Sequence, residues 1–164
     1  MDLIKACKRG DTECIKRRLC GLVDVNFQDQ YGKTALMWAC VTSHPDIVKL
    51  LCEHGANPDI QDNSRFTALM WAIINHRSSI VQELCTCNLE LKDHGGRTAL
   101  TWAVTVNDYE CVKQLCIKGA RVVRGATVNL HILQLLTKQQ FRGNVLVLVG
   151  HIQIELLRCV HEWI

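Results

Sequence analysis

The sequence contains few of the residues that interrupt regular structure. Its 164 residues include 2 prolines and 10 glycines, and aromatic residues make up 5%. The scarcity of proline and glycine, together with 48% hydrophobic residues, argues against a disordered chain. The formal net charge of +3 is too small to indicate a polyanion-binding protein by itself.

The sequence also lacks long apolar runs. The first residues, Met1 to Lys5, are interrupted by Asp2 and Lys5, so a signal peptide is not expected. Uncharged runs such as Gly143 to Ile154 fall short of the roughly 20 residues that cross a bilayer. We therefore expect an intracellular protein, cytoplasmic or nuclear, without membrane insertion.

One short stretch occurs three times. Thr34 to Ala39 reads TALMWA; the same letters return from Thr67 to Ala72, and TALTWA runs from Thr98 to Ala103. The period is 33 residues and then 31, which is typical of stacked repeat proteins. Each unit contains an apolar helix after the Thr, a turn, a second helix and a polar loop.

The second helix of the first full unit has clear start and stop signals. Pro45 suits the first helical position, where its missing N–H costs nothing. Ile47, Val48 and Leu51 then follow the spacing of one buried helix face. Gly55 suits the positive φ that often ends a helix.

This unit resembles the ankyrin repeat. The resembling residues are Asp29-x-Tyr31-Gly32-Lys33-Thr34-Ala35-Leu36, then Ile47-Val48-Lys49-Leu50-Leu51, then His54-Gly55-Ala56-Asn57. The resemblance implies an all-α, ankyrin-type helical repeat solenoid, in which helix–turn–helix units are joined by β-hairpin finger loops. It also implies that the first helices line a concave face.

Two departures from the family pattern concern local geometry. Met37, Met70 and Thr101 stand where the family has His, so its Thr–His hydrogen bonds are absent. Arg65 stands where the family has Gly, which puts the turn of the second finger in question.

The resemblance covers residues 1–122. Residues 1–33 are interpreted as an amino-terminal cap repeat, because Arg17 and Arg18 stand where Leu50 and Leu51 stand later. The repeats then run over 34–66, 67–97 and, in part, 98–122. Residues 123–164 are interpreted as a degenerate repeat or a carboxy-terminal capping tail.

Ten cysteines leave open a disulfide framework, a metal site or buried thiols. Cys52, Cys85 and Cys116 each follow the last Leu of a second helix, which favours small apolar core residues. The lone Cys85-x-Cys87 lacks the second pair of a zinc site. We expect no metal, no cofactor and no small-molecule substrate, and no catalytic motif indicates an enzyme.

Basic residues crowd the first repeat. They form either an electrostatic patch for an acidic partner or nucleic acid, or a solvated cap. We favour the cap, because Asp2, Asp11 and Glu13 dilute the charge. No aromatic residues interleave, so nucleic acid is not an expected partner. The basic residues are Lys5, Lys8, Arg9, Lys16, Arg17 and Arg18.

The expected function is a non-enzymatic protein–protein interaction module that binds a partner protein through finger loops and the concave face. The alternative is an adaptor whose carboxy-terminal tail docks a second protein complex while the repeats hold a client. The three tryptophans either pack repeat against repeat or form an apolar ledge for the partner. The predicted partner-binding residues are Tyr31, Lys33, Trp38, Val41, Thr42, Asn63, Arg65, Phe66, Trp71, Ile74, Asn75, His94, Arg97 and Trp102.

Overall fold

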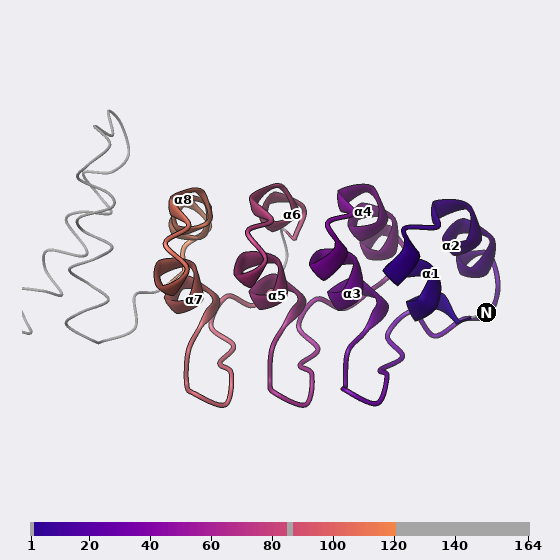
Figure 1. Cartoon of the computed structure of the whole chain (residues 1–164), viewed down its shortest axis with the longest axis horizontal. Helices are drawn as coiled ribbons and strands as arrows, with labels where there is room; N and C mark the ends of the chain where they lie inside the picture. The colour runs from indigo at the N-terminus through magenta and orange to yellow at the C-terminus, as the bar shows by residue number, and fades with distance from the viewer. Residues whose placement is uncertain (1, 85–86, 121–164) are drawn as a thin grey trace, which may run out of the picture.

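The computed structural model describes residues 2–84 and 87–120. Over these ranges the chain forms eight helices, arranged as a row of helix pairs with finger loops projecting from one side (Figure 1). The predicted helix-pair repeat is therefore observed. The predictions made for the tail 123–164 and for Cys85 lie outside the described residues.

Each repeat contributes one first helix and one second helix. Each first helix packs against the next first helix along the row and against the second helix of its own repeat. The first helices are α1 (Leu3–Arg9), α3 (Ala35–Thr42), α5 (Ala68–Ile74) and α7 (Ala99–Thr105). The second helices are α2 (Thr12–Leu19), α4 (Pro45–Glu53), α6 (Ser78–Glu83) and α8 (Tyr109–Ile117).

The repeated Thr of each unit is the N-cap of a first helix. Its hydroxyl oxygen accepts a hydrogen bond from the backbone N–H three residues ahead, which satisfies one of the orphan donors at the helix start. The distances are 3.3 Å from Met37 to Thr34, 3.3 Å from Met70 to Thr67, and 3.4 Å from Thr101 to Thr98. The Met37 and Met70 side chains fill core positions, whereas the Thr101 hydroxyl lies 3.2 Å from that of Thr98.

Several cysteines belong to the hydrophobic core. Cys7, Cys40, Cys111 and Cys116 are buried among leucine, isoleucine, valine and alanine side chains. Burial raises the pKa of Cys7 to about 12 and that of Cys116 to about 11, so these thiols stay protonated near neutral pH. The interpretation of cysteines as apolar core residues is confirmed at these four positions, whereas Cys52 is only partly buried against the core.

The first repeat differs from the others at the end of the row. Arg18 is half-buried where Leu51 of the next repeat is fully buried. The following loop, in contrast, exposes the apolar side chains of Leu22 and Phe27. The helices of this repeat are thus more polar than their equivalents, while its loop is not.

The turn of the second finger is the same as the others despite Arg65. Arg65 has φ of 61°, in the left-handed region that Gly32 and Gly96 occupy at 74°. Its N–H donates to the Asp62 carbonyl oxygen at 2.8 Å, as the Gly32 N–H does to that of Asp29. The arginine therefore adopts the backbone conformation that glycine has in the neighbouring fingers.

Because a side chain at positive φ costs about 1–2 kcal/mol, we expect Arg65→Gly to stabilise the protein. The extra flexibility of glycine in the unfolded chain offsets part of that gain. The expected net increase in the free energy of unfolding is about 0.5–1 kcal/mol, measured by urea denaturation. Arg65→Ala is the control, since it removes the side chain beyond Cβ but keeps the unfavourable φ. Equal stability of the two variants would contradict this account.

Candidate functional site

Three tryptophans, one on each of α3, α5 and α7, are fixed by three aspartates at the base of the fingers. In each repeat the indole N–H donates to the carboxylate of the aspartate that begins the finger turn. The distances are 2.9 Å for Trp38 to Asp29, 2.9 Å for Trp71 to Asp62, and 3.0 Å for Trp102 to Asp93. Asp62 and Asp93 are only 6% and 3% exposed, so these hydrogen bonds are shielded from water.

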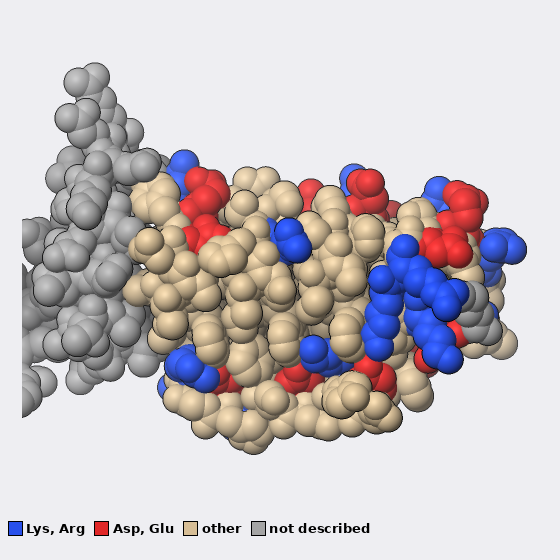
Figure 2. All heavy atoms as spheres, in the orientation of Figure 1, with Lys and Arg blue, Asp and Glu red and all other residues tan. Residues whose placement is uncertain are grey.

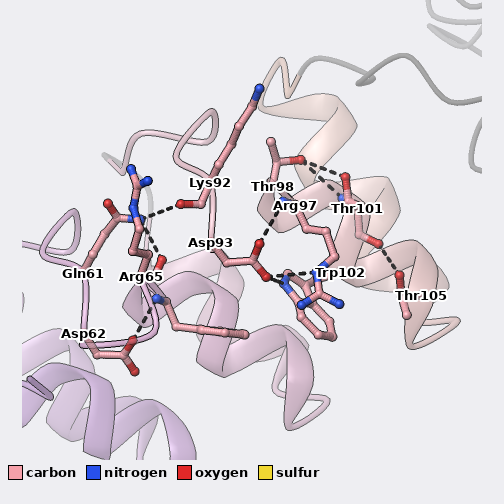
Figure 3. Close-up of polar contacts among 11 residues, drawn as sticks. Gln61, Asp62, Arg65, Lys92, Asp93, Arg97, Thr98, Thr101, Trp102 and Thr105 are labelled. Atoms are coloured by element: carbon pink, nitrogen blue, oxygen red, sulfur yellow. Dashed lines mark hydrogen bonds and ion pairs between the residues drawn. The ribbon is translucent and has the colours of Figure 1, made fainter. Parts of the chain in front are cut away.

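The same carboxylates close the finger turns. The other oxygen of Asp62 accepts the backbone N–H groups of Ser64 and Phe66, each at 2.9 Å. Asp93 accepts the Arg97 backbone N–H at 2.9 Å and its side-chain Nε–H at 3.0 Å (Figure 3). One aspartate per repeat therefore joins the finger to the first helix.

The surroundings of Asp29 and Asp93 favour the ionised form of each carboxylate. Burial is the largest single influence on Asp29 and raises its pKa, but hydrogen bonds from the Trp38 indole and the backbone of Lys33 and Tyr31 outweigh it. The charge of Lys8 adds to them, and the net pKa of Asp29 lies below its ordinary value. For Asp93, burial is likewise outweighed, and hydrogen bonds from Arg97 and Trp102 hold its pKa below the usual range.

The gaps between the indole rings are filled by the residue that precedes the repeated Thr. The Lys33 ammonium nitrogen lies 3.5 Å from the ring centroid of Trp71 and 4.6 Å from that of Trp38. The Phe66 ring centroid lies 5.3 Å from that of Trp71 and 5.4 Å from that of Trp102. These are the distances of cation–π and aromatic pairs.

Two further cations extend the row at its ends. The Lys8 ammonium nitrogen lies 3.8 Å from the Trp38 ring centroid, and the Arg97 guanidinium carbon lies 4.0 Å from that of Trp102. We call the continuous row the ladder. It consists, in spatial order, of Lys8, Trp38, Lys33, Trp71, Phe66, Trp102 and Arg97.

The fingers are also bonded to one another. The Gln28 side-chain amide donates to the carbonyl oxygens of Gly32, at 2.6 Å, and of Gln61 in the next finger, at 3.1 Å. The Gln61 side-chain amide likewise donates to the carbonyl oxygens of Arg65, at 2.6 Å, and of Lys92, at 2.9 Å (Figure 3). These hydrogen bonds join the three finger loops into one continuous surface, which we call the finger edge.

A close approach of the backbone adds to this contact. A Cβ atom on Gly32 would stand 2.5 Å from the Asn63 side-chain oxygen, so the first two fingers touch too closely for another residue here. The Asn63 N–H donates to the Tyr31 carbonyl oxygen at 3.1 Å. The finger edge is consequently pre-organised rather than three independent loops.

The structure divides the predicted partner-binding residues into three groups. Tyr31, Asn63, Arg65 and His94 lie exposed along the fingers, with Tyr31 57% exposed. Lys33, Phe66, Arg97 and the three tryptophans form most of the ladder. Val41, Thr42, Ile74 and Asn75 lie half-buried at the ends of α3 and α5.

Some of these side chains have a structural task. The Thr42 hydroxyl donates to the Trp38 carbonyl oxygen at 2.9 Å, and the Asn75 amide donates to that of Trp71 at 2.8 Å. The contacts of the indole rings fit the first of the two alternatives given for the tryptophans, which is packing between repeats. Partner binding by the same residues stays a prediction.

Sequence reasoning did not single out the three aspartates. The signal was present, because an aspartate stands nine residues before each tryptophan: Asp29, Asp62 and Asp93 precede Trp38, Trp71 and Trp102. A repeated acidic residue at a fixed distance from a repeated indole indicates a hydrogen bond that every unit reuses.

None of the helices in residues 2–84 and 87–120 is long and apolar enough to cross a bilayer. Within those same ranges, no three His, Cys, Asp or Glu side chains gather closely enough to hold a metal ion.

Stacked pairs of short helices with finger loops bonded edge to edge define a helical repeat protein. Ankyrin repeats, in three copies, match residues 3–62 and 56–126. The chain belongs to the ankyrin repeat family, whose members are generally protein–protein interaction modules and typically non-catalytic.

Curated relatives share a shorter segment. Osteoclast-stimulating factor 1 from Rattus norvegicus, Bos taurus and Mus musculus is in each case 45% identical over 49 residues. The match covers 30% of this chain and 23% of each relative, so the chain matches less than a quarter of the relatives' length.

Proposed function

We propose that this protein is a non-enzymatic interaction module that binds a partner protein through its finger loops and its concave face, the face that carries the ladder. The observation that supports this most is the finger edge. Its backbone is fixed by hydrogen bonds between fingers, yet it exposes large side chains such as Tyr31 and Arg65. A pre-organised surface loses little conformational entropy on binding, and exposed aromatic and arginine side chains are the usual anchors of interfaces.

The proposal also places the protein inside the cell. Cys20 is an exposed free thiol. Free exposed thiols persist in a reducing compartment, which favours the cytoplasm or the nucleus.

The experiment is an affinity capture from cell lysate with three forms of the full chain, followed by quantitative mass spectrometry. The finger variant is Tyr31→Ala with Arg65→Gly, which removes two exposed side chains and relieves the positive φ at residue 65. The matched control is Lys49→Ala with Glu53→Ala on the exposed side of α4, away from the fingers (Figure 1). All three forms are first checked for equal helicity by circular dichroism.

We expect a protein that wild type and control capture equally and that the finger variant captures at least about tenfold less, equivalent to 1.4 kcal/mol. That protein is then purified and its binding to the three forms is measured directly. Equal capture by all three forms would exclude the fingers as the binding surface.

A further inference from the structure

In the first repeat, basic side chains occupy the positions that correspond to the ladder face of the later repeats. When the sequence is shifted by the 33-residue period, α1 aligns with α3. Three cations of α1 then fall on the ladder face, at an i, i+3, i+4 spacing that keeps them on one side of the helix. In this register Lys5 matches Trp38, Lys8 matches Val41, and Arg9 matches Thr42.

The cations of α1 and those of α2 differ in their acidic neighbours. On α2, Glu13 accepts the Lys16 ammonium at 3.4 Å, and its backbone carbonyl accepts the Arg17 Nε–H at 3.3 Å. Helix α1 contains no acidic residue between Leu3 and Arg9, but Asp2 is its N-cap and Lys8 forms an ion pair with Asp29 at 3.9 Å. Asp29 is therefore a partner of Lys8 and of the finger turn, since it also accepts three N–H groups.

The result is a concentration of positive charge at one end of the ladder face. Figure 2 shows Lys and Arg side chains gathered over α1, whereas basic and acidic groups alternate where the fingers meet the later first helices. We call Lys5, Lys8 and Arg9 the basic end. Like charges at these spacings destabilise a helix slightly, so a negatively charged partner would relieve the repulsion.

Cationic and aromatic side chains lie close to the tryptophan rings beside the basic end. Lys8 of the preceding repeat covers one side of the Trp38 ring, and Lys33 lies between Trp38 and Trp71. Phe66 covers the other side of Trp71. The Lys8 and Lys33 ammonium groups in this row favour an anion.

We propose that the basic end, together with Lys33, binds an acidic segment of the partner protein that lies along the ladder. This inference rests on the proposed function and specifies the chemistry of its partner. Carboxylates of such a segment would pair with Lys5, Lys8 and Arg9, and electrostatic attraction would raise the association rate. A peptide is favoured over single-stranded nucleic acid, because bases stack on open aromatic faces and the Trp38 and Trp71 rings already contact Lys8, Lys33 and Phe66.

The test measures peptide binding to the purified full chain by fluorescence anisotropy. The probes are fluorescein-labelled 12-residue peptides in which Ala alternates with Glu or with Gln, and a 12-nucleotide single-stranded DNA. The site variant is Lys5→Glu with Arg9→Glu, which leaves Lys8 and the ladder intact. The matched control is Lys16→Glu with Arg17→Glu on α2, the same charge change on the same repeat.

We expect the Glu peptide to bind at least about tenfold more tightly than the Gln peptide, and the α1 variant to lose at least tenfold in affinity. The α2 control should stay within about threefold of wild type, because its residues lie off the ladder face. Equal losses in the two variants would show a general effect of net charge and would overturn the proposal. DNA binding tighter than Glu-peptide binding, with the same loss in the α1 variant, would also overturn it and assign the surface to nucleic acid.

This outcome is independent of the capture experiment. A partner lost from the finger variant, with no preference for the Glu peptide, would leave the interaction module standing and exclude the acidic segment. Glu-peptide binding at the basic end, with no change in capture by the finger variant, would support the anion site and exclude the fingers.

Discussion

Replacing Asp93 with alanine is expected to lower the free energy of unfolding by about 3 kcal/mol, about 1.5 kcal/mol for each of the hydrogen bonds from the Arg97 backbone and the Trp102 indole, while water replaces the carboxylate at the half-exposed Arg97 guanidinium. The Asp93 side chain is 1% exposed and accepts the Arg97 backbone N–H, the Arg97 Nε–H and the Trp102 indole N–H. Without the carboxylate, donors at the base of the third finger are left buried without an acceptor. The same change also removes the partner of the Arg97 guanidinium, which stacks on Trp102.

Urea denaturation followed by far-ultraviolet circular dichroism measures this effect. Glu53→Ala is the control, because Glu53 is an exposed acidic residue at the end of α4, and we expect a change within about 0.5 kcal/mol. Asp93→Asn should fall between the two, since its amide oxygen replaces one acceptor while its NH₂ group faces another donor. A loss in Asp93→Ala no larger than in the control would show that water reaches the finger base.

The pH dependence of Asp93→Ala gives a second readout of the same hydrogen bonds. The pKa of Asp93 is lowered in the folded protein, so its contribution to stability is present above the unfolded pKa, about 3.9. That contribution is lost as pH falls through the folded pKa. The variant should therefore lose less stability than wild type between pH 5 and pH 3, while the contribution of Asp29 remains in both.

The sequence predicts the repeat well because the features that define it are local. A Thr that caps a helix, a Pro at its first position and a Gly just past its end act within a few residues, and all three are found as expected at Thr34, Pro45 and Gly55. The ankyrin resemblance supplied the order of the elements, and the period of the tryptophans supplied their common position.

The ladder could not be predicted in the same way, because it depends on the lateral spacing between repeats. Nothing in the local sequence shows that Lys33 fits between two indole rings or that Phe66 lies between Trp71 and Trp102. Phe66 was predicted as a binding anchor, and its half-buried place between two rings gives it a structural task as well.

Arg65 shows the limit of reasoning from residue type alone. The absence of glycine put the second finger turn in question, yet the Asp62 carboxylate holds both Ser64 and Phe66 by their backbone N–H groups. These charged hydrogen bonds outweigh the cost of about 1–2 kcal/mol for an arginine at positive φ. The turn is therefore determined by a residue three positions earlier than the one that departs from the pattern.

Replacing Trp71 with alanine is expected to destabilise the protein by about 3 kcal/mol, the lower part of the range for a large aromatic residue because Trp71 is only half-buried. Three contacts are lost at once: the stack on Phe66, the cation–π contact with Lys33 and the hydrogen bond to Asp62. Since Lys33 and Phe66 belong to different repeats of the row, the loss falls on contacts between neighbouring units, on which a repeat array depends.

Trp71→Phe separates the stack from the hydrogen bond. Phenylalanine keeps an aromatic face for Lys33 and Phe66 but has no N–H, so we expect a loss of about 1–1.5 kcal/mol, measured by urea denaturation. A double-mutant cycle with Asp62→Asn should give a coupling energy of about 1 kcal/mol, because the two residues share one hydrogen bond. If Trp71→Phe were as destabilising as Trp71→Ala, the hydrogen bond alone would account for the effect, and the ladder would not contribute to holding the repeats together. A large difference with a small coupling energy would instead show that the stacked rings carry the stability and that the aspartate chiefly orients them.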